Sequence, residues 1–136
     1  TDAAAMVAER FHLEYYQVVA GTHAAPTATV KLVKDGTEIT RAGLGVGSVD
    51  AVYATISEIA GLPHALVDYV VHSVTGGTDA MGEVAVRISD QDGRVFTGRG
   101  ADTDIINASA KAYVQALNRL AAHQPSFSPQ EVVETV

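Results

Sequence analysis

The chain has 136 residues, of which 47% are hydrophobic and 18% are charged. This length suits one domain that buries roughly two thirds of its unfolded surface, and no apolar run approaches the roughly 20 residues of a membrane span. The absence of cysteine excludes disulfides and thiolate metal sites and fits a reducing, cytoplasmic location. The formal net charge of −7, with nine scattered Lys and Arg residues, argues against nucleic acid as a partner.

Residues 1–10 form a polar, Ala-rich arm, and the first half of the domain then predicts three strands and a helix. The strand segments carry alternating or β-branched and aromatic residues, Asp35-Gly36 predicts a hairpin turn, and Ser48 is the expected N-cap of the helix. The expected bounds are 12–20, 28–33 and 37–42 for the strands and 48–60 for the helix, which Gly61-Leu62-Pro63 ends.

The second half repeats this order. A long apolar strand, a Gly-rich loop over 76–82, two further strands around an Asp92-Gly93 turn and a longer helix follow one another. The expected bounds are 65–74, 83–88 and 94–97 for the strands and 104–122 for the helix. Residues 124–136 contain two prolines and are expected to form a flexible tail.

Matching residues recur 53 to 57 positions apart, which indicates an internal duplication. The matched pairs are Tyr15 and Tyr69, Gly36 and Gly93, Gly45 and Gly98, Gly47 and Gly100, Asp50 and Asp104, and Val52 and Ile106. We predict an α+β fold of two pseudo-symmetric βββα units, each an antiparallel sheet with a helix, over residues 11–62 and 63–123. Such sheets keep open faces and edges, so a homodimer is expected.

Each repeat leads into its helix through a glycine-rich stretch, 43–47 in the first and 98–100 in the second. A helix begins with unpaired N–H groups and a partial positive charge, so either stretch could receive a small carboxylate or phosphate. The same glycines would equally suit a turn that needs them for backbone geometry alone. With Asp79 or carbonyl groups for a cation, and Ala51 and Ala80 leaving room for an apolar side chain, an amino acid fits these features.

The sequence offers little to support catalysis. The five His residues show no metal-ligand spacing, and a triad of His72, Ser73 and Asp79 would lack the Gly-x-Ser-x-Gly elbow. The stretch 45–50 is neither a Walker motif nor a dinucleotide fingerprint, and hairpins precede it where a βαβ unit would be needed. We therefore expect a binding domain with no catalytic residue, metal or cofactor of its own.

Four motifs, in order along residues 11–121, resemble the C-terminal regulatory domain of α-isopropylmalate synthase. They are the runs Gly45 to Ala51, Leu66 to Tyr69, Thr75 to Val84 and Gly98 to Asn118. Ser48 departs from the family pattern, because many members carry Pro there, and this alters only the rigidity of the first helical turn.

The resemblance implies a domain that dimerises and binds L-leucine as a feedback inhibitor. The inhibited part of the family's enzymes is an upstream barrel that uses a divalent metal to condense acetyl-CoA with 2-oxoisovalerate. Because this chain does not begin with Met and lacks the barrel, it is expected to be a piece of a longer protein. Leucine between the two repeats would shift the population of two arrangements, with a coupling free energy of about 1 to 3 kcal/mol.

The resemblance also implies an effector site. By position its members are Gly45, Val46, Gly47, Leu66, Tyr69, Ser73, Asp79, Ala80, Ala101 and Thr103. Some of these residues have a simpler explanation: Leu66 as a core residue, Tyr69 as a core or interface aromatic, and Asp79 as the acceptor in an Asx turn. His72 is expected to be hydrogen-bonded at an interface, and it would make binding pH-dependent if it lay near the effector carboxylate.

Two alternative functions stay open beside leucine sensing. The equivalent domain of citramalate synthase binds isoleucine, and the two pockets would differ around Val46, Leu66 and Ala80, where one methyl group is worth about 1 to 3 kcal/mol. The other alternative is a dimerisation module that binds no ligand.

Overall fold

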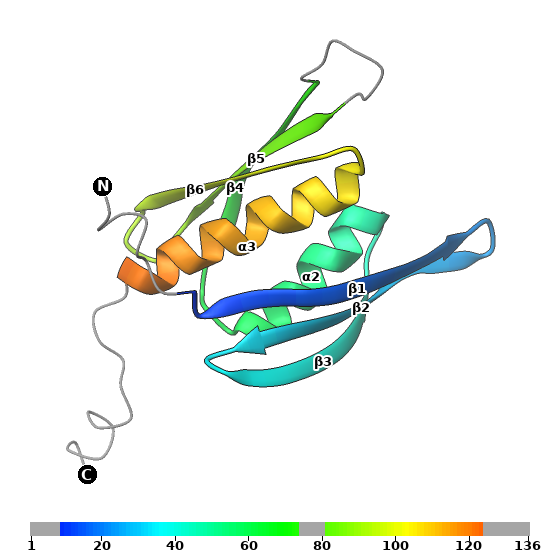
Figure 1. Cartoon of the computed structure of the whole chain (residues 1–136), viewed down its shortest axis with the longest axis horizontal. Helices are drawn as coiled ribbons and strands as arrows, with labels where there is room; N and C mark the ends of the chain where they lie inside the picture. Colours follow the sequence, from blue (N-terminus) through cyan, green and yellow to red (C-terminus); the bar gives the residue numbers. More distant parts are fainter. Residues whose placement is uncertain (1–8, 74–80, 124–136) are drawn as a thin grey trace.

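The computed structural model describes residues 9–73 and 81–123, which form two βββα units (Figure 1). The first unit comprises strands β1 (Phe11–Gly21), β2 (Ala24–Lys34) and β3 (Thr37–Leu44) and helix α2 (Ser48–Ala60). The second comprises β4 (Ala65–Ser73), β5 (Gly82–Ser89), β6 (Val95–Asp102) and helix α3 (Ile105–His123). The predicted α+β fold with an internal duplication is confirmed. The predictions for residues 1–8, 74–80 and 124–136 lie outside the described residues.

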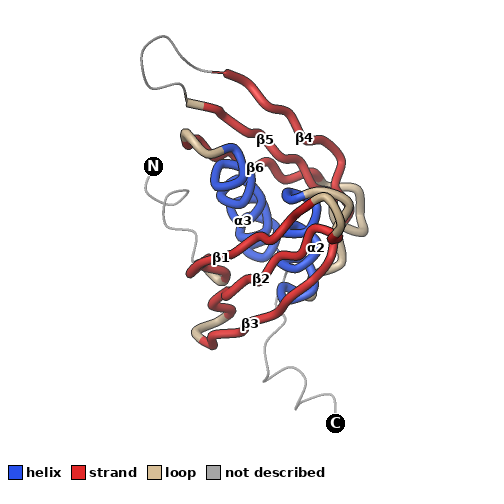
Figure 2. The backbone as a smooth tube through the Cα atoms, turned by 90° about the vertical axis from the view of Figure 1, so that its right-hand side faces the viewer, coloured by secondary structure: helices blue, strands red, loops and turns tan. Residues whose placement is uncertain are grey.

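Each unit forms one antiparallel sheet in sequence order, β1-β2-β3 and β4-β5-β6. The two helices lie between the sheets, with α2 on the first sheet and α3 on the second (Figure 2). Alternate residues of the central strands point inward, so Val30, Leu32, Val86 and Ile88 are fully buried. These side chains and helical residues such as Leu117 form one core that both units share.

Helix α2 begins at Ser48 because Gly47, in an extended conformation, takes the N-cap position. The prediction that Ser48 caps the helix is therefore wrong. At the other end Gly61 adopts a left-handed backbone (φ 68°), which lets its N–H group donate to the Ser57 carbonyl. The helix end predicted at 61–63 is confirmed.

A two-residue turn joins β1 to β2, with Gly21 opposite Ala24. The sequence prediction had ended the first strand at Ala20 and begun the second at Ala28, because the intervening residues include a proline. Pro26 lies within β2 where the β1–β2 register shifts. Proline is tolerated at such a bulge because a ladder hydrogen bond is missing there.

The second glycine stretch belongs to a strand and not to a turn. β6 continues through Gly98 and Gly100, whereas the prediction had ended this strand at Thr97. A Cβ atom on Gly98 would overlap the carbonyl oxygen of Ala112, and one on Gly100 would overlap that of Ala108. The two glycines therefore allow α3 to pack directly on the backbone of β6.

The structural repeat spacing is 57 residues from the second hairpin of each unit onward. Gly36 and Gly93 both have positive φ in matching turns, and the helices begin at residues 48 and 105. Gly43 and Gly100 occupy matching inward positions of β3 and β6. The predicted pairings of Gly45 with Gly98, Gly47 with Gly100, Asp50 with Asp104 and Val52 with Ile106 are therefore wrong, because they rest on spacings of 53 or 54 residues.

The first strands of the two units match at a spacing of 53 residues. Both β1 and β4 shift register one residue after a leucine, Leu13 in β1 and Leu66 in β4. Counting from that shift, Tyr16 corresponds to Tyr69, and the predicted match of Tyr69 with Tyr15 is wrong. A bulge moves the residues that follow it to the opposite face of the sheet, and the alternation of apolar and polar residues does not show where such a bulge lies.

The two units are tied together at the start of β1. The Phe11 N–H group donates to the side-chain oxygen of Asn118 at 2.8 Å, and the Asn118 amide donates to the Phe11 carbonyl at 2.9 Å. Phe11 is fully buried and Asn118 nearly so. A side chain of α3 thus replaces a neighbouring strand at this end of β1.

Candidate ligand-binding site at the helix N-termini

The loop before α2 presents backbone N–H groups without a side-chain cap. Gly45 donates its N–H to the Pro26 carbonyl at 3.0 Å, and Val46 donates to the Asp50 carboxylate at 2.9 Å. Among the described residues no side chain caps the helix at Gly47. The first-turn N–H groups of α2 are therefore free of side-chain acceptors and suit an anionic ligand group.

The N-terminus of α3 is closed by its own acids. The Asp104 carboxylate accepts from the Ile106 N–H at 2.8 Å, and Asp102 accepts from the Asp104 N–H at 2.9 Å and from Lys111 at 3.0 Å. The Asp104 N–H bond, followed by Lys111, holds the pKa of the Asp102 carboxyl below its usual value. A ligand carboxylate would meet two like charges here and one, that of Asp50, at the start of α2, so the two helix N-termini are not equivalent binding sites.

Strand β4 turns Leu66 and Tyr69 toward the helices. In the register Leu66 lies opposite Ile88 and Tyr69 opposite Val86, both of which are fully buried. Yet 51% of the Leu66 surface is exposed, because no Cα atom of β4 comes within 8 Å of a helix in the described ranges. The inner face of β4 is therefore an open, partly apolar surface beside α2.

Three aromatic rings, which we call the tyrosine cluster, fill the space between β4 and the two helices: Tyr53, Tyr69 and Tyr113. Tyr53 stacks on Tyr113 at 4.3 Å between centroids and meets Tyr69 edge to face at 6.0 Å. Burial raises the pKa values of Tyr53 and Tyr113, so both hydroxyls stay neutral at physiological pH. Neither Tyr53 nor Tyr113 is among the predicted effector residues.

Ser109 of α3 is the polar centre of the tyrosine cluster. Its hydroxyl lies 2.7 Å from the Tyr69 hydroxyl, and its carbonyl accepts from the Tyr53 hydroxyl at 2.8 Å. Ser109 is fully buried. No local sequence signal marks this serine, because its partners are 40 and 56 residues away along the chain.

His64 extends the network from the linker between α2 and β4. Its Nδ1 atom lies 2.6 Å from the Leu62 carbonyl, which can only accept, so Nδ1 carries the proton. In the neutral ring Nε2 then accepts from the Tyr113 hydroxyl at 2.7 Å. His72, the histidine that the sequence placed at an interface, is exposed and lies opposite Glu83 of β5.

The predicted effector residues fall into three groups. Gly45, Val46 and Gly47 form the loop before α2, Leu66 and Tyr69 lie on β4, and Ala101 and Thr103 precede α3. Both helices begin at the same end of the molecule (Figure 1), and the Tyr53–Ser109 bond joins their N-terminal halves. Ser73 is the last residue of β4, and Asp79 and Ala80 lie outside the described residues.

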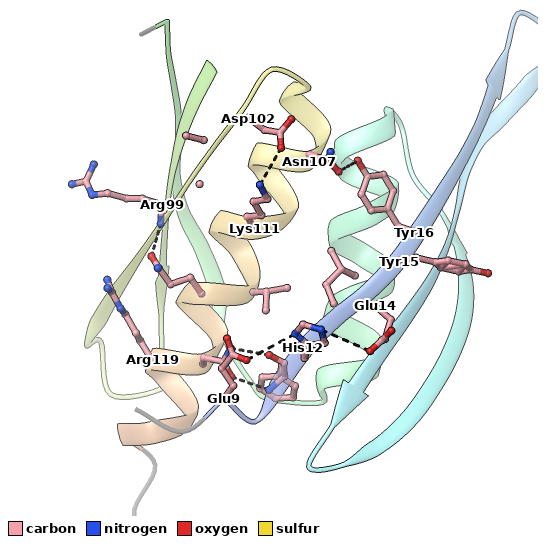
Figure 3. Close-up of a pocket in the computed structure, with 17 residues that line it drawn as sticks. Glu9, His12, Glu14, Tyr15, Tyr16, Arg99, Asp102, Asn107, Lys111 and Arg119 are labelled. Atoms are coloured by element: carbon pink, nitrogen blue, oxygen red, sulfur yellow. Dashed lines mark hydrogen bonds and ion pairs between the residues drawn. The ribbon is translucent and has the colours of Figure 1, made fainter. Parts of the chain in front are cut away.

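A groove of about 1160 Å³ lies on the other side of the helix pair, between β1 and α3 (Figure 3). Tyr16 points to Asn107 of α3, with 2.5 Å between the hydroxyl and the amide oxygen, whereas Tyr15 points away. The walls carry opposite charges: Arg99, Lys111 and Arg119 from β6 and α3, and Glu9 and Glu14 near β1. Of the predicted effector residues that the structure describes, Ala101 alone lines this groove.

Two other kinds of site are absent from residues 9–73 and 81–123. No group of three or more His, Asp or Glu side chains there could hold a metal ion. No helix in the same ranges is long and apolar enough to cross a bilayer. The fold and its surfaces define a duplicated α+β domain that offers uncapped N–H groups, an aromatic cluster and an open apolar strand.

Comparison with known proteins identifies the family. The family described as the LeuA allosteric (dimerisation) domain matches residues 1–121, and the chain belongs to it. The 2-isopropylmalate synthase of Crocosphaera subtropica is 49% identical over 131 residues, which cover 93% of this chain and 24% of that protein. Those of Dictyoglomus turgidum and a Nostoc species are 47% and 52% identical, over 85% and 82% of this chain and 23% and 21% of those proteins. The chain spans about a quarter of the length of these relatives.

Proposed function

We propose that this chain is the leucine-binding regulatory domain of a 2-isopropylmalate synthase and that it mediates feedback inhibition and contributes to a homodimer. The observation that carries the proposal is the family match over residues 1–121, with relatives near 50% identity that are 2-isopropylmalate synthases. The inhibited partner is the catalytic barrel of the same enzyme, which supplies the divalent metal and the acyl-transfer chemistry.

The groups around β4 and α2 support an amino acid as the ligand. The uncapped N–H groups near Gly47 suit its carboxylate. Leu66 and Tyr69 offer an apolar and an aromatic surface to a branched side chain. We assign the ammonium group to Asp79, a carboxylate that the family resemblance places in the effector site.

Open apolar strands support dimerisation. Leu66, Val67 and Val71 of β4 are 51%, 51% and 48% exposed, and Tyr15 and Val19 of β1 are 49% and 55% exposed. Both strands lie at sheet edges. Edges and apolar surface of this kind are normally covered in an assembly.

The proposal is tested by a thermal-shift titration of the 136-residue chain with L-leucine, L-isoleucine and L-valine. Leucine at 100 times its Kd adds about 2.7 kcal/mol to the folded state, which raises the melting temperature by several degrees in a domain of this size. A larger shift with isoleucine would assign the chain to the citramalate synthase type. No shift in a sample that sedimentation shows to be dimeric would leave a ligand-free dimerisation module.

Replacing Asp79 by Ala tests the predicted ammonium contact. We expect weaker leucine binding in calorimetry with an unchanged circular dichroism spectrum, because the variant loses the carboxylate that would pair with the ligand ammonium group. Asp92→Ala, in the β5–β6 loop, is the matched control and should bind like the unaltered chain. Equal affinities for both variants would remove Asp79 from the site.

A further inference from the structure

Strand β4 is connected to the helices through one polar side chain. Its backbone pairs with β5 alone, and in the described ranges the Tyr69–Ser109 pair is the one hydrogen bond from β4 to either helix. The Tyr69 ring also contacts Tyr53 edge to face. The position of the Tyr69 ring therefore depends on the hydrogen bond between its hydroxyl and Ser109.

Ser109 is well placed to fix the Tyr69 hydroxyl. Its Oγ lies 2.7 Å from the Tyr69 oxygen, and both its backbone and side chain are fully buried. The Tyr53 hydroxyl bonds the Ser109 carbonyl at 2.8 Å, and Tyr53 in turn stacks on Tyr113. A buried serine with a partner on each side has one favourable arrangement, because an unpaired hydroxyl in this core would be costly.

We infer that Ser109 is a positioning residue for leucine: it holds Tyr69 in the binding orientation from α3 without touching the ligand itself. The inference rests on the proposed function, in which Tyr69 contacts leucine. It adds a residue inside α3 to a site whose proposed contacts on described residues lie on β4 and in the segments before α2 and α3. A ligand that finds Tyr69 already ordered loses less conformational entropy on binding.

The test is a double-mutant cycle of leucine affinity by calorimetry, with Ser109→Ala, Tyr69→Phe and the double variant. Each single change removes the same hydrogen bond, so each should weaken leucine binding about five-fold. The double variant should also lose about five-fold, and not the product of the two losses. Thr55→Val removes another fully buried hydroxyl, one that bonds only within α2, and should leave the affinity unchanged.

The outcomes separate the inference from the proposed function. Absence of leucine binding by the unaltered chain contradicts the proposed function itself. Normal binding by the unaltered chain and by Ser109→Ala overturns the positioning role alone. A merely structural role for Ser109 would weaken binding equally in the Tyr69 and Phe backgrounds, so multiplicative losses would also overturn the inference.

Discussion

The two repeats share a fold and differ in how the helix meets its sheet. In the second repeat Gly98 and Gly100 bring α3 onto the backbone of β6. In the first repeat Arg41 occupies the position that matches Gly98, and Gly43 meets the Thr55 side chain of α2. At these matching strand positions the second repeat therefore packs backbone on backbone, whereas in the first repeat Gly43 faces a side chain; there the close backbone contact with α2 is made by Gly45, after the strand ends.

The two helices also differ in their N-terminal caps and in their lengths. Asp104 caps α3, and no described side chain caps α2 at Gly47. At its other end α3 extends to Asn118 and beyond, while the matching position of α2 is Gly61, where that helix stops. The duplication has thus produced one repeat whose helix has no side-chain cap at its N-terminus and one whose longer, capped helix also binds the start of β1.

The largest expected effect comes from the glycines of β6. Gly98→Ala should lower the free energy of unfolding by about 3 kcal/mol or more, because the new methyl group overlaps backbone atoms of α3 that cannot rotate away. Urea unfolding measures the change.

Gly43→Ala in the first repeat should lower the free energy of unfolding by less than Gly98→Ala does. Adding Thr55→Ala should restore part of that loss, since the obstacle there is the Thr55 hydroxyl at 2.6 Å. Gly21→Ala, which meets nothing within 4 Å, is the control. Equal losses at Gly43 and Gly98 would contradict the contrast between the repeats.

The two hydrogen bonds between Phe11 and Asn118, which we call the β1 clasp, should give the next largest effect. Asn118→Ala leaves the buried N–H and carbonyl of Phe11 without partners and should cost about 2 kcal/mol in the free energy of unfolding. Asn107→Ala, which removes a part-buried bond to Tyr16 in the same groove, is expected to cost about half as much. Hydrogen exchange of the Phe11 amide in Asn118→Ala gives a local measure, and unchanged protection would disprove the clasp.

The tyrosine cluster predicts instability at high pH. Burial raises the folded-state pKa values of Tyr53 and Tyr113, so their stabilising contribution is complete below the unfolded-state pKa near 10 and is lost as the pH rises above it. Each tyrosine should steepen the loss by about 1.4 kcal/mol per pH unit. Melting temperatures from pH 8 to 11 test this, with Tyr53→Phe flattening the curve. A curve that Tyr53→Phe does not alter would be inconsistent with ionisation of that residue.

The smallest effect is expected at the β2–β3 turn of the first repeat. Arg10 holds Asp35 through two bonds of 2.9 and 3.0 Å and lowers the pKa of that carboxyl. The stability that the pair contributes is therefore present above the unfolded-state pKa near 3.9 and is lost as the pH falls below it. Because the pair is exposed, Asp35→Asn should change the free energy of unfolding by less than about 1 kcal/mol. Asn also tolerates the positive φ of this turn, and a larger loss would mean that the charge matters more than the turn.

Local patterns were enough to predict the order of the elements. The Asp35-Gly36 turn, the helix end at Gly61 and the alternation along β2 and β5 all depend on neighbouring residues, and the structure confirms them. The extension of β6 through Gly98 was not predictable in this way. A glycine inside a strand becomes favourable only when a helix packs on it, and that helix is distant in the sequence.

The candidate site was predictable to a similar degree. The family motifs indicated Gly45 to Gly47 and Tyr69, which the structure places beside α2 and on the inner face of β4. Ser109 and Asn118 carry no such signal, because each acts on a residue far along the chain: Ser109 on Tyr69 and Asn118 on Phe11. Side-chain pairs of this kind become visible only when the two repeats are packed together.

The bond between Phe11 and Asn118 also constrains how the domain is made. These residues are 107 positions apart, so the first strand emerges from the ribosome long before the helix that completes it. Until α3 has been synthesised, Phe11 lacks both its hydrogen-bond partner and part of its burial. The first repeat therefore cannot reach its final form by itself during translation. Folding must bring together two residues that are 107 positions apart, and contacts of such long range slow the folding of small domains.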